Sequence, residues 1–354
     1  MATRTLELSG RPLIATAHDA PFFVDRVEEV RAARESLEAG INVLLLGERG
    51  SGKTTFLRFL SKELEEAGWR AVFVEGSLAT TPVELLTLIR ARVSPSLELG
   101  GIGEQLVTSV QALQALNRPR TVARRPTGAA GDSEALLDLV SALGKDVAGD
   151  KRRHVVLIDE VSSPELVHTV FGRLRDEIWQ LPIVWIVAGH SKDVFALLRP
   201  PADAFFSRVI TLEAFDEELA FRLLRTRVPR KQASDGLLRA IVAESSGLPR
   251  DLVDTASAVV VRGANPEQLA ISRERRERAL DSLGEAAKRV VAELEANGPA
   301  SASDERFLAR LDFGRSRAAQ IFRDLEQLGI VEASRDHSSG GRNRKVYGLK
   351  ATGK

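Results

Sequence analysis

The chain has 354 residues, more than one ordinary hydrophobic core accommodates, so we expect two or three domains. It contains no cysteine, which excludes disulfides, thiolate zinc sites and cysteine nucleophiles, and no apolar run approaches the roughly 18 residues that span a bilayer. The formal net charge is +1, yet residues 310–354 carry ten Lys/Arg against five Asp/Glu, which suggests an anionic partner for this region. The N-terminus lacks the pattern of a signal peptide, and we expect a cytoplasmic protein without a membrane partner.

Short apolar runs alternate with helical patterns over the first two thirds of the chain. Buried strands are predicted at 41–46, 70–76, 154–160, 182–189 and 208–214. Helices are predicted at 54–67, with Phe56, Leu57, Phe59, Leu60 and Leu64 on one stripe, at 81–93 and at 104–116, and a flexible surface loop at 117–133. Continuous apolar strands that alternate with helices indicate an α/β fold, with a parallel sheet covered by helices on both faces.

The sequence GERGSGKTT at 47–55 has the spacing G-x-x-x-x-G-K-[ST]. Glycines allow positive φ angles, so backbone N–H groups can close around phosphate oxygens, and the following helix adds the partial positive charge of its N-terminus. Lys53 is expected to reach the β- and γ-phosphates, and the Thr54 hydroxyl to bind Mg²⁺. The alternative, a glycine turn with a chance lysine, is disfavoured because a strand is predicted before the loop and a helix after it. We therefore predict an ATP–Mg²⁺ site formed by Gly47, Gly50, Ser51, Gly52, Lys53, Thr54 and Thr55.

Two acidic residues, Asp159 and Glu160, end the apolar run 154–160. An Asp at the carboxyl end of a strand beside a phosphate loop can hold Mg²⁺ and its water shell. The adjacent Glu can orient and polarise the attacking water. The alternative is a pair of solvated carboxylates in a turn. Because a phosphate loop lies upstream and a predicted strand lies between the two motifs, we predict that this site hydrolyses ATP.

With these motifs, the chain resembles the AAA+ ATPases over nearly its whole length, in particular the Orc1/Cdc6-like branch and its STAND relatives. The segment PFFVDRVEEV at 21–30 is similar to the F-V-G-R-E segment that flanks the adenine pocket in this group, with Asp25 where the family usually has Gly. The resemblance implies that Val24 and Arg26 lie near adenine. The alternative is a plain helix start.

The resemblance also implies residues that contact the γ-phosphate. His190 stands at the sensor 1 position, where the family more often has Asn, Ser or Thr, or else it only ends a strand. Arg208 is the candidate arginine finger for a neighbouring subunit's nucleotide, or else a surface Arg on an edge strand. In SSGLPRDL at 245–252, Pro249 is implied to pack near adenine and Arg250 to act as sensor 2. The alternative there is a helix start with proline in its first turn.

From about residue 283 the pattern predicts three helices and then two short strands around HSSGGRN, which is typical of a winged helix-turn-helix. The third helix is predicted to bury Ala318, Ile321, Phe322, Leu325 and Leu328. Its outward face can contact bases, and the basic strand ends can contact phosphates. The residues predicted to bind DNA are Arg315, Arg317, Gln320, Arg323, Arg342, Arg344 and Lys345. Such modules also bind proteins, but the basic charge favours DNA.

We therefore predict an AAA+ P-loop ATPase core at 1–214, a helical lid at 215–282 and a winged helix-turn-helix at 283–354. The favoured function is an ATPase whose nucleotide state controls duplex DNA binding, and which forms a homo-oligomer on ATP because an arginine finger in trans needs a neighbour. The main alternative is a STAND-like switch or adaptor whose winged helix binds protein, in a mobile-element or phage-defence system with a separate effector. A third interpretation is a DNA-bound transcription regulator that ATP gates.

Overall fold

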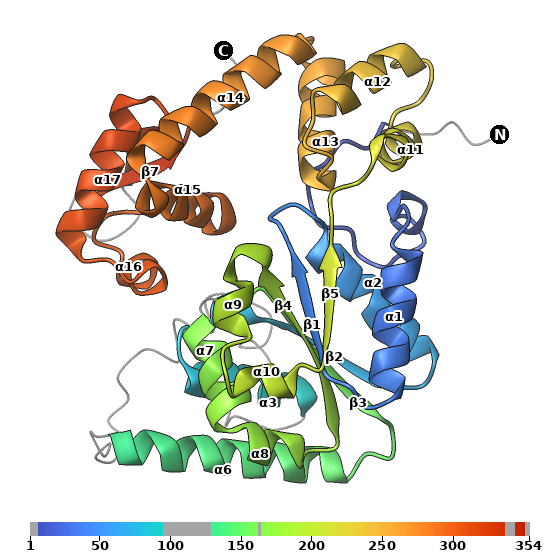
Figure 1. Ribbon diagram of the computed structural model, residues 1–354, viewed down its shortest axis with the longest axis vertical. Helices are drawn as coiled ribbons and strands as arrows, with labels where there is room; N and C mark the ends of the chain where they lie inside the picture. Colours follow the sequence, from blue (N-terminus) through green and yellow to red (C-terminus); the bar gives the residue numbers. More distant parts are fainter. Residues whose placement is uncertain (1–5, 95–128, 162–163, 337–343, 351–354) are drawn as a thin grey trace. The chain divides into compact units, whose positions relative to one another are not determined.

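The computed structural model describes residues 6–94, 129–161, 164–336 and 344–350, which divide into two compact units (Figure 1). The first unit runs to Arg230 and includes Ser246–Val253. The second consists of Lys231–Ser245 and of the chain from Asp254 onward. None of the described helices combines the length and apolar character needed to cross a lipid bilayer.

A five-stranded parallel sheet forms the centre of the first unit. Its strands are β1 (Val43–Gly47), β2 (Arg70–Glu75), β3 (His154–Asp159), β4 (Ile183–His190) and β5 (Arg208–Leu212). They lie side by side in the order β2-β3-β4-β1-β5. All five predicted strands are confirmed. Because the strands are parallel, Gly47, Asp159 and His190 end at the same edge of the sheet.

Helices cover both faces of this sheet (Figure 1). One face carries α1 (Val27–Glu38) and α2 (Lys53–Glu66), and the other carries α3 (Pro82–Val93), α6 (Ala129–Ala148), α7 (Pro164–His168) and α8 (Arg175–Trp179). Consecutive residues of β1 divide between the two cores: Leu44 packs on the α3 side and Leu45 on the α2 side. Burial on both faces explains why the strands read as continuous apolar runs.

Shorter elements complete the first unit. They are η1 (Ala20–Phe22), η2 (Gly76–Leu78), the π-helical turn η3 (Thr169–Arg173), η4 (Ser191–Asp193), α9 (Val194–Leu197), α10 (Ala202–Phe205) and α11 (Glu217–Arg227). Local chemistry sets several helix starts. Thr81 and Glu84 form a capping box at α3, with Pro82 at its first position, and the Asp216 carboxylate accepts a hydrogen bond from the Leu219 N–H at α11.

The loop predicted at 117–133 is wrong for residues 129–133, which open α6. Small and polar residues at the start of this helix indicated a loop. The residues that follow include a buried helical stripe, formed by Leu136, Val140, Leu143 and Val147, and the helix begins before that stripe. The rest of the predicted loop and the predicted helix at 104–116 lie outside the described residues.

The second unit is helical and ends in a two-stranded sheet. Its elements are α12 (Asp235–Ala243), the end of α13 (Pro249–Ala256), the π-helical turn η5 (Ser257–Val261), α14 (Pro266–Leu283), α15 (Glu285–Asn297), α16 (Glu305–Leu311), α17 (Arg315–Gln327), β6 (Val331–Asp336) and β7 (Arg344–Leu349). The helical pattern predicted after Phe215, the three predicted helices that follow and the predicted strand pair are confirmed.

Stacked rings hold the C-terminal helices against the hairpin. Phe322 of α17 lies between Phe307 of α16 and Tyr347 of β7, with ring centroids 5.4 and 4.3 Å away. The inward residues predicted for α17 are buried except Leu328, which is 47% exposed. Gly329, with φ of 68°, ends the helix and turns the chain, so Ile330 enters the core in place of Leu328.

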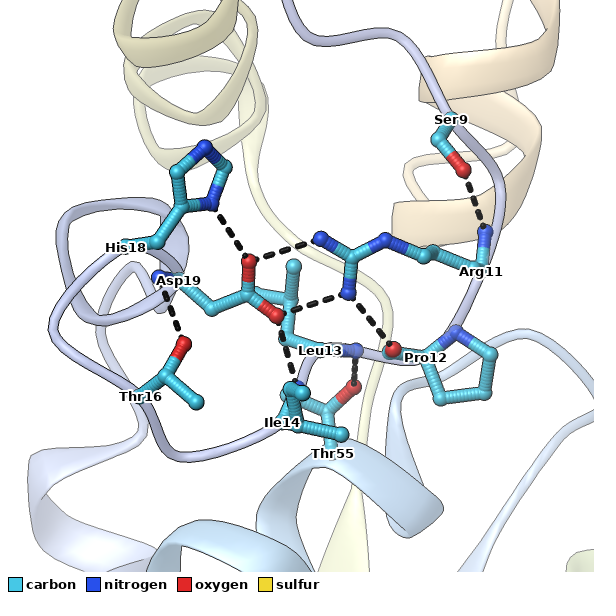
Figure 2. Close-up of polar contacts among 9 residues, drawn as sticks. All are labelled: Ser9, Arg11, Pro12, Leu13, Ile14, Thr16, His18, Asp19 and Thr55. Carbon is cyan, nitrogen blue, oxygen red and sulfur yellow. Dashed lines mark hydrogen bonds and ion pairs between the residues drawn. The ribbon is translucent and has the colours of Figure 1, made fainter.

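The N-terminal strap (residues 9–19) is closed by one buried carboxylate (Figure 2). Asp19 is 1% exposed, and it accepts two hydrogen bonds of 2.7 Å from Arg11 and one of 2.8 Å from the Ile14 N–H. His18 Nδ1 lies 3.0 Å from the same carboxylate. The Arg11 guanidinium holds the pKa of Asp19 well below its usual range. Charged hydrogen bonds therefore offset the cost of burying this group.

We expect Asp19→Asn to lower the free energy of unfolding at pH 7 by about 1–3 kcal/mol, because it removes the charge from these hydrogen bonds. The folded-state pKa of Asp19 is lowered, so its contribution is present above the unfolded-state pKa of about 4 and is lost as the pH falls through the lower folded-state value. The difference between variant and wild type should shrink below about pH 4. Urea unfolding at pH 7, 5 and 3 measures it.

Asp176→Asn is the matched control, since its carboxylate pairs with Arg175 on the surface and is 72% exposed. It should change stability little. An Asp19→Asn penalty that is the same at pH 3 and pH 7 would contradict the assignment.

Candidate functional site

The loop between β1 and α2 contains glycines at positions where a residue with a side chain would be strained or would clash. Gly50 and Gly52 have φ of 86° and 97°, in the left-handed region. A Cβ on Gly47 would lie 2.4 Å from the buried Ser51 Oγ. The loop follows a strand and leads directly into α2, as the sequence predicted. This geometry fits a phosphate group held by backbone N–H groups and the start of a helix.

Lys53 is the first residue of α2, and its side chain contacts the backbone of this loop. Its ammonium donates hydrogen bonds of 2.8 Å to the Gly47 carbonyl and 3.0 Å to the Glu48 carbonyl. Burial lowers the pKa of Lys53, while the negative charges of Glu160 and Asp159 raise it. The lysine predicted to contact phosphates and the two predicted carboxylates therefore share one electrostatic environment.

The two carboxylates after β3 differ in exposure. Asp159 is 7% exposed, and burial raises its pKa to about 6, with repulsion from Glu160 adding to the rise and a hydrogen bond with Thr54 opposing it. Glu160 is exposed and has φ of 50°, in the left-handed region. One acid is thus held beside the loop and its neighbour faces solvent.

Gly76, which sequence reasoning missed, permits the close approach of β2 to these acids. A Cβ on Gly76 would lie 2.8 Å from Ile158 Cγ2 and 3.1 Å from the Glu160 carbonyl oxygen. Glu75 pairs with Asp159 in the sheet, so Gly76 follows directly where the two strands end. The only sequence signal for this contact was a glycine at the end of a predicted strand.

The loop has the oxygen donors that Mg²⁺ requires. Thr54 and Asp159, the predicted ligands, share a hydrogen bond, so a hydroxyl and a carboxylate lie side by side. Within the described residues, no three His, Asp or Glu side chains form a metal site by themselves. A Mg²⁺ ion held here would take its other ligands from phosphate oxygens and water, as this ion commonly does.

His190 ends β4 directly beside the loop, paired with Gly47 in the sheet register. Its Nδ1 accepts a hydrogen bond of 3.0 Å from the Lys192 N–H. Burial lowers the pKa of His190, and the positive charge of Lys53 lowers it further. The ring is therefore neutral near pH 7, and with Nδ1 an acceptor, its proton is on Nε2 and available for donation.

The start of α13 approaches the loop from a distant part of the sequence. The Arg250 N–H donates a hydrogen bond of 3.2 Å to the Gly50 carbonyl, and the charge of Arg250 contributes to the lowered pKa of Lys53. Gly247, with φ of 75°, precedes Pro249 at the helix start, and a Cβ there would lie 2.6 Å from the Phe215 carbonyl oxygen. The structure thus brings Arg250 to the loop.

Arg26 and Val24 both lie in the core of the first unit. Val24 is 9% and Arg26 7% exposed. The Arg26 guanidinium forms an ion pair of 2.9 Å with Glu29, donates to the Glu213 carbonyl, and lies 4.5 Å from the centroid of the Phe215 ring. These contacts fasten the start of α1 to the segment after β5. The guanidinium already has these partners, so any contact between Arg26 and adenine remains a prediction.

Arg208 does not join this group. It is exposed at the start of β5, where it pairs with Val43, whereas Leu212 at the other end of β5 pairs with Gly47 beside the loop. Four residue-to-residue steps of about 3.3 Å each separate Arg208 from Leu212 beside the loop. Its position excludes a role at the loop of its own chain.

In the second unit, α17 presents a polar face. Arg317, Gln320 and Arg323 are exposed at intervals of three residues. The Arg317 guanidinium lies 4.7 Å from the Phe313 ring centroid, and Gln320 donates to Asp324 at 2.8 Å and accepts from Arg323. Arg315 is exposed, 3.3 Å from Glu305. The predicted residues of α17 therefore lie on one surface.

The strand residues predicted to bind DNA are described only in part. Lys345 of β7 is 53% exposed and forms an ion pair of 3.0 Å with Glu326 of α17. Arg344 begins β7, and Arg342 lies outside the described residues.

Part of the chain matches a known protein family, and the chain is similar to several solved structures. Residues 38–191 match a protein family described as AAA domain. Among solved structures, the chain is similar to Aeropyrum pernix ORC1 in complex with DNA (18% identity, 93% of this chain and 90% of that chain covered, TM-score 0.48). It is also similar to Aeropyrum pernix ORC2, solved as ADPNP–ADP complexes (16% identity, 92% of this chain and 90% of that chain covered, TM-score 0.49). A third similar structure is Cdc6p from Pyrobaculum aerophilum (17% identity, 94% of this chain and 93% of that chain covered, TM-score 0.49). No curated protein matches the sequence.

The fold is that of the P-loop ATPases of the AAA+ class. The parallel sheet with helices on both faces, the phosphate loop after β1 and the match to an AAA domain establish it, and the predicted fold class is confirmed. The same observations support nucleotide binding and hydrolysis as the activity of this class.

We expect His190→Ala to lower the kcat of ATP hydrolysis by roughly tenfold or more, because a hydrogen-bond donor beside the phosphate loop is lost. His190→Asn, which keeps an N–H donor, should retain most of the activity. The effect should be equal at pH 7 and pH 8.5, since the pKa of His190 is lowered and the ring is neutral at both.

His168→Ala is the matched control, because His168 bonds the Pro200 carbonyl and lies outside the loop. A steady-state phosphate-release assay compares the three variants. Equal losses for the His190 variants Ala and Asn would show that donation is not the role of this ring.

Proposed function

We propose that this chain is an AAA+ ATPase whose nucleotide state controls duplex DNA binding through a C-terminal winged helix. One observation carries the nucleotide part. Lys53, Asp159, His190 and Arg250 come from four separate segments and gather at a single glycine-shaped loop. A lysine, an acid that can hold Mg²⁺ and an arginine at one phosphate loop are groups that recur in phosphoryl transfer, and the neutral imidazole adds a hydrogen-bond donor.

In this proposal ATP is the substrate and each group has one role. Lys53 neutralises charge on the β- and γ-phosphates, and Glu160 orients and polarises the attacking water. Thr54 and Asp159 would hold Mg²⁺, which supplies charge neutralisation at the phosphate oxygens. His190 and Arg250 contact the γ-phosphate, while Val24, Arg26 and Pro249 lie on the adenine side.

The domain boundaries proposed from sequence are a core at 1–214, a lid at 215–282 and a winged helix at 283–354. The contact between Arg250 and the phosphate loop supports a lid that responds to the nucleotide, because it joins the segment after α12 to the core. The three helices and hairpin after residue 283 support the winged helix.

DNA is the proposed partner of the winged helix. The polar face of α17, with Arg317, Gln320 and Arg323, has the side chains that form bidentate contacts with bases, and Arg315 begins the same helix. Lys345 and Arg344 on β7 would contact phosphates. The excess of basic residues between 310 and 354 supports an anionic partner.

An ATP-dependent homo-oligomer is part of the proposal. Arg208 is exposed at the sheet edge opposite its own phosphate loop, so it can act as a finger only on the nucleotide of a neighbouring subunit.

A nucleotide-dependent adaptor is the second candidate. Several residues of the proposed DNA surface already have acidic neighbours: Arg315 pairs with Glu305, Lys345 pairs with Glu326, and the neutral Gln320 donates to Asp324. Mixed charge of this kind also suits a protein partner, which would then be the separate effector.

We expect Lys53→Ala to abolish ATP binding, and Glu160→Gln to retain binding while lowering kcat by about 10²–10⁴ and prolonging any ATP-dependent assembly. Lys62→Ala is the control, because it lies on the same helix and pairs with Glu66 at the surface. Nucleotide titration, phosphate release and light scattering measure the three effects. Wild-type turnover in the Glu160→Gln variant would remove this residue from the mechanism.

The proposed control of DNA binding is tested by measuring duplex binding through fluorescence anisotropy, with ATP, ADP or no nucleotide over a salt series. We expect binding that requires ATP and weakens steeply with salt, and Arg317→Ala with Arg344→Ala should weaken it and reduce the slope by about one per lost phosphate contact. Lys288→Ala is the control, since its ammonium pairs with Asp281 and Glu285. No binding in any state, even in low salt, would favour the adaptor.

A further inference from the structure

The N-terminal strap is hydrogen-bonded to the phosphate-loop helix (Figure 2). The backbone N–H of Leu13 donates a hydrogen bond of 3.1 Å to Oγ1 of Thr55, across 42 residues of sequence. Thr55 is the third residue of α2, two positions after Lys53. Successive helical residues point about 100° apart, so Thr54 faces Asp159 and Thr55 faces the strap.

This contact fixes how the Thr55 hydroxyl can act. A hydroxyl has one proton to donate and two lone pairs that accept. The Leu13 N–H occupies one lone pair, and a backbone amide cannot accept the hydroxyl proton in return. Among the described residues, no acceptor receives that proton. The Thr55 hydroxyl is thus oriented with its proton directed away from the strap.

Asp19 determines where the Leu13 N–H lies. Its carboxylate accepts from the Ile14 N–H, the amide directly after Leu13, and from both Nη atoms of Arg11. The carboxylate therefore holds the backbone directly after Leu13 and the side chain two residues before it. Leu13 is itself 4% exposed, so the segment is packed as well as bonded.

We propose that Asp19 is a positioning residue of the nucleotide site, which acts through Leu13 to hold the Thr55 hydroxyl as a donor to a phosphate oxygen of bound ATP. The inference rests on the proposed function, since it assigns a role within the same phosphate loop. It extends the site to a segment that carries no nucleotide-binding motif. Asp19 itself touches no phosphate.

A double-mutant cycle on ATP affinity tests the proposal. Asp19→Asn, Thr55→Val and the double variant are titrated with a fluorescent ATP analogue, below the melting temperature of each. We expect Thr55→Val to weaken binding about tenfold, because a hydrogen bond to a charged group is lost, and Asp19→Asn about threefold to tenfold. In the T55V background, Asp19→Asn should weaken binding less than about twofold, since the group it positions is gone.

Further variants separate positioning from a general loss of structure. T55S keeps the hydroxyl, so the full effect of Asp19→Asn should return in that background. Arg11→Ala disturbs the same carboxylate from a side chain that is 41% exposed, and should weaken binding in the same direction. Asp150→Asn is the matched control: Asp150 also pairs with an arginine and a histidine, Arg152 and His154, but it precedes β3 at the sheet edge away from the loop. It should leave ATP affinity unchanged.

Equal weakening by Asp19→Asn in the wild-type and T55V backgrounds would overturn the proposal, as would no weakening in the wild type. If wild-type protein binds ATP and the cycle is additive, only the role of Asp19 fails. If wild-type protein does not bind ATP, the proposed function fails and the role of Asp19 with it.

Discussion

Parallel pairing of the strands is the constraint on which the nucleotide site depends. It brings the carboxyl ends of β1, β3 and β4 to one edge, so the phosphate loop, the acidic pair and His190 become neighbours although more than a hundred residues separate the first from the others. The same constraint removes Arg208 to the opposite edge. One topological rule thus decides which groups lie at the phosphate loop of this chain and which lie at the far end of the strands.

Charge inside this edge is balanced over several segments. Lys53 is partly buried close to Asp159 and Glu160, and Arg250 adds a second positive charge from α13. Burial alone would favour the neutral forms of the lysine and the acid, and their mutual attraction opposes that tendency. Loss of any one of these charges therefore changes the electrostatic environment of the others.

Much of the fold could be predicted because strands buried on both faces read as continuous apolar runs, and because the loop motif fixes its own local geometry. Residues that belong to no motif and matter only through distant contacts could not be predicted. Gly76 matters only because β2 pairs with β3, and Asp19 only because the strap closes on α2. The start of α6 at Ala129 was not predicted because its composition suggested a loop. The exposure of Leu328 was not predicted because the following glycine redirects the chain.

Glu160 illustrates what such a site costs the fold. Its φ of 50° is unfavourable by roughly 1–2 kcal/mol for any residue with a Cβ. Glycine would adopt this backbone freely, and so position 160 is one where the most stable residue and the chemically competent residue differ. With glutamate as the catalytic base, selection for stability alone would favour glycine at this position. The resulting protein would be more stable and would bind nucleotide without hydrolysing it. A switch locked in one state would then be a single substitution away.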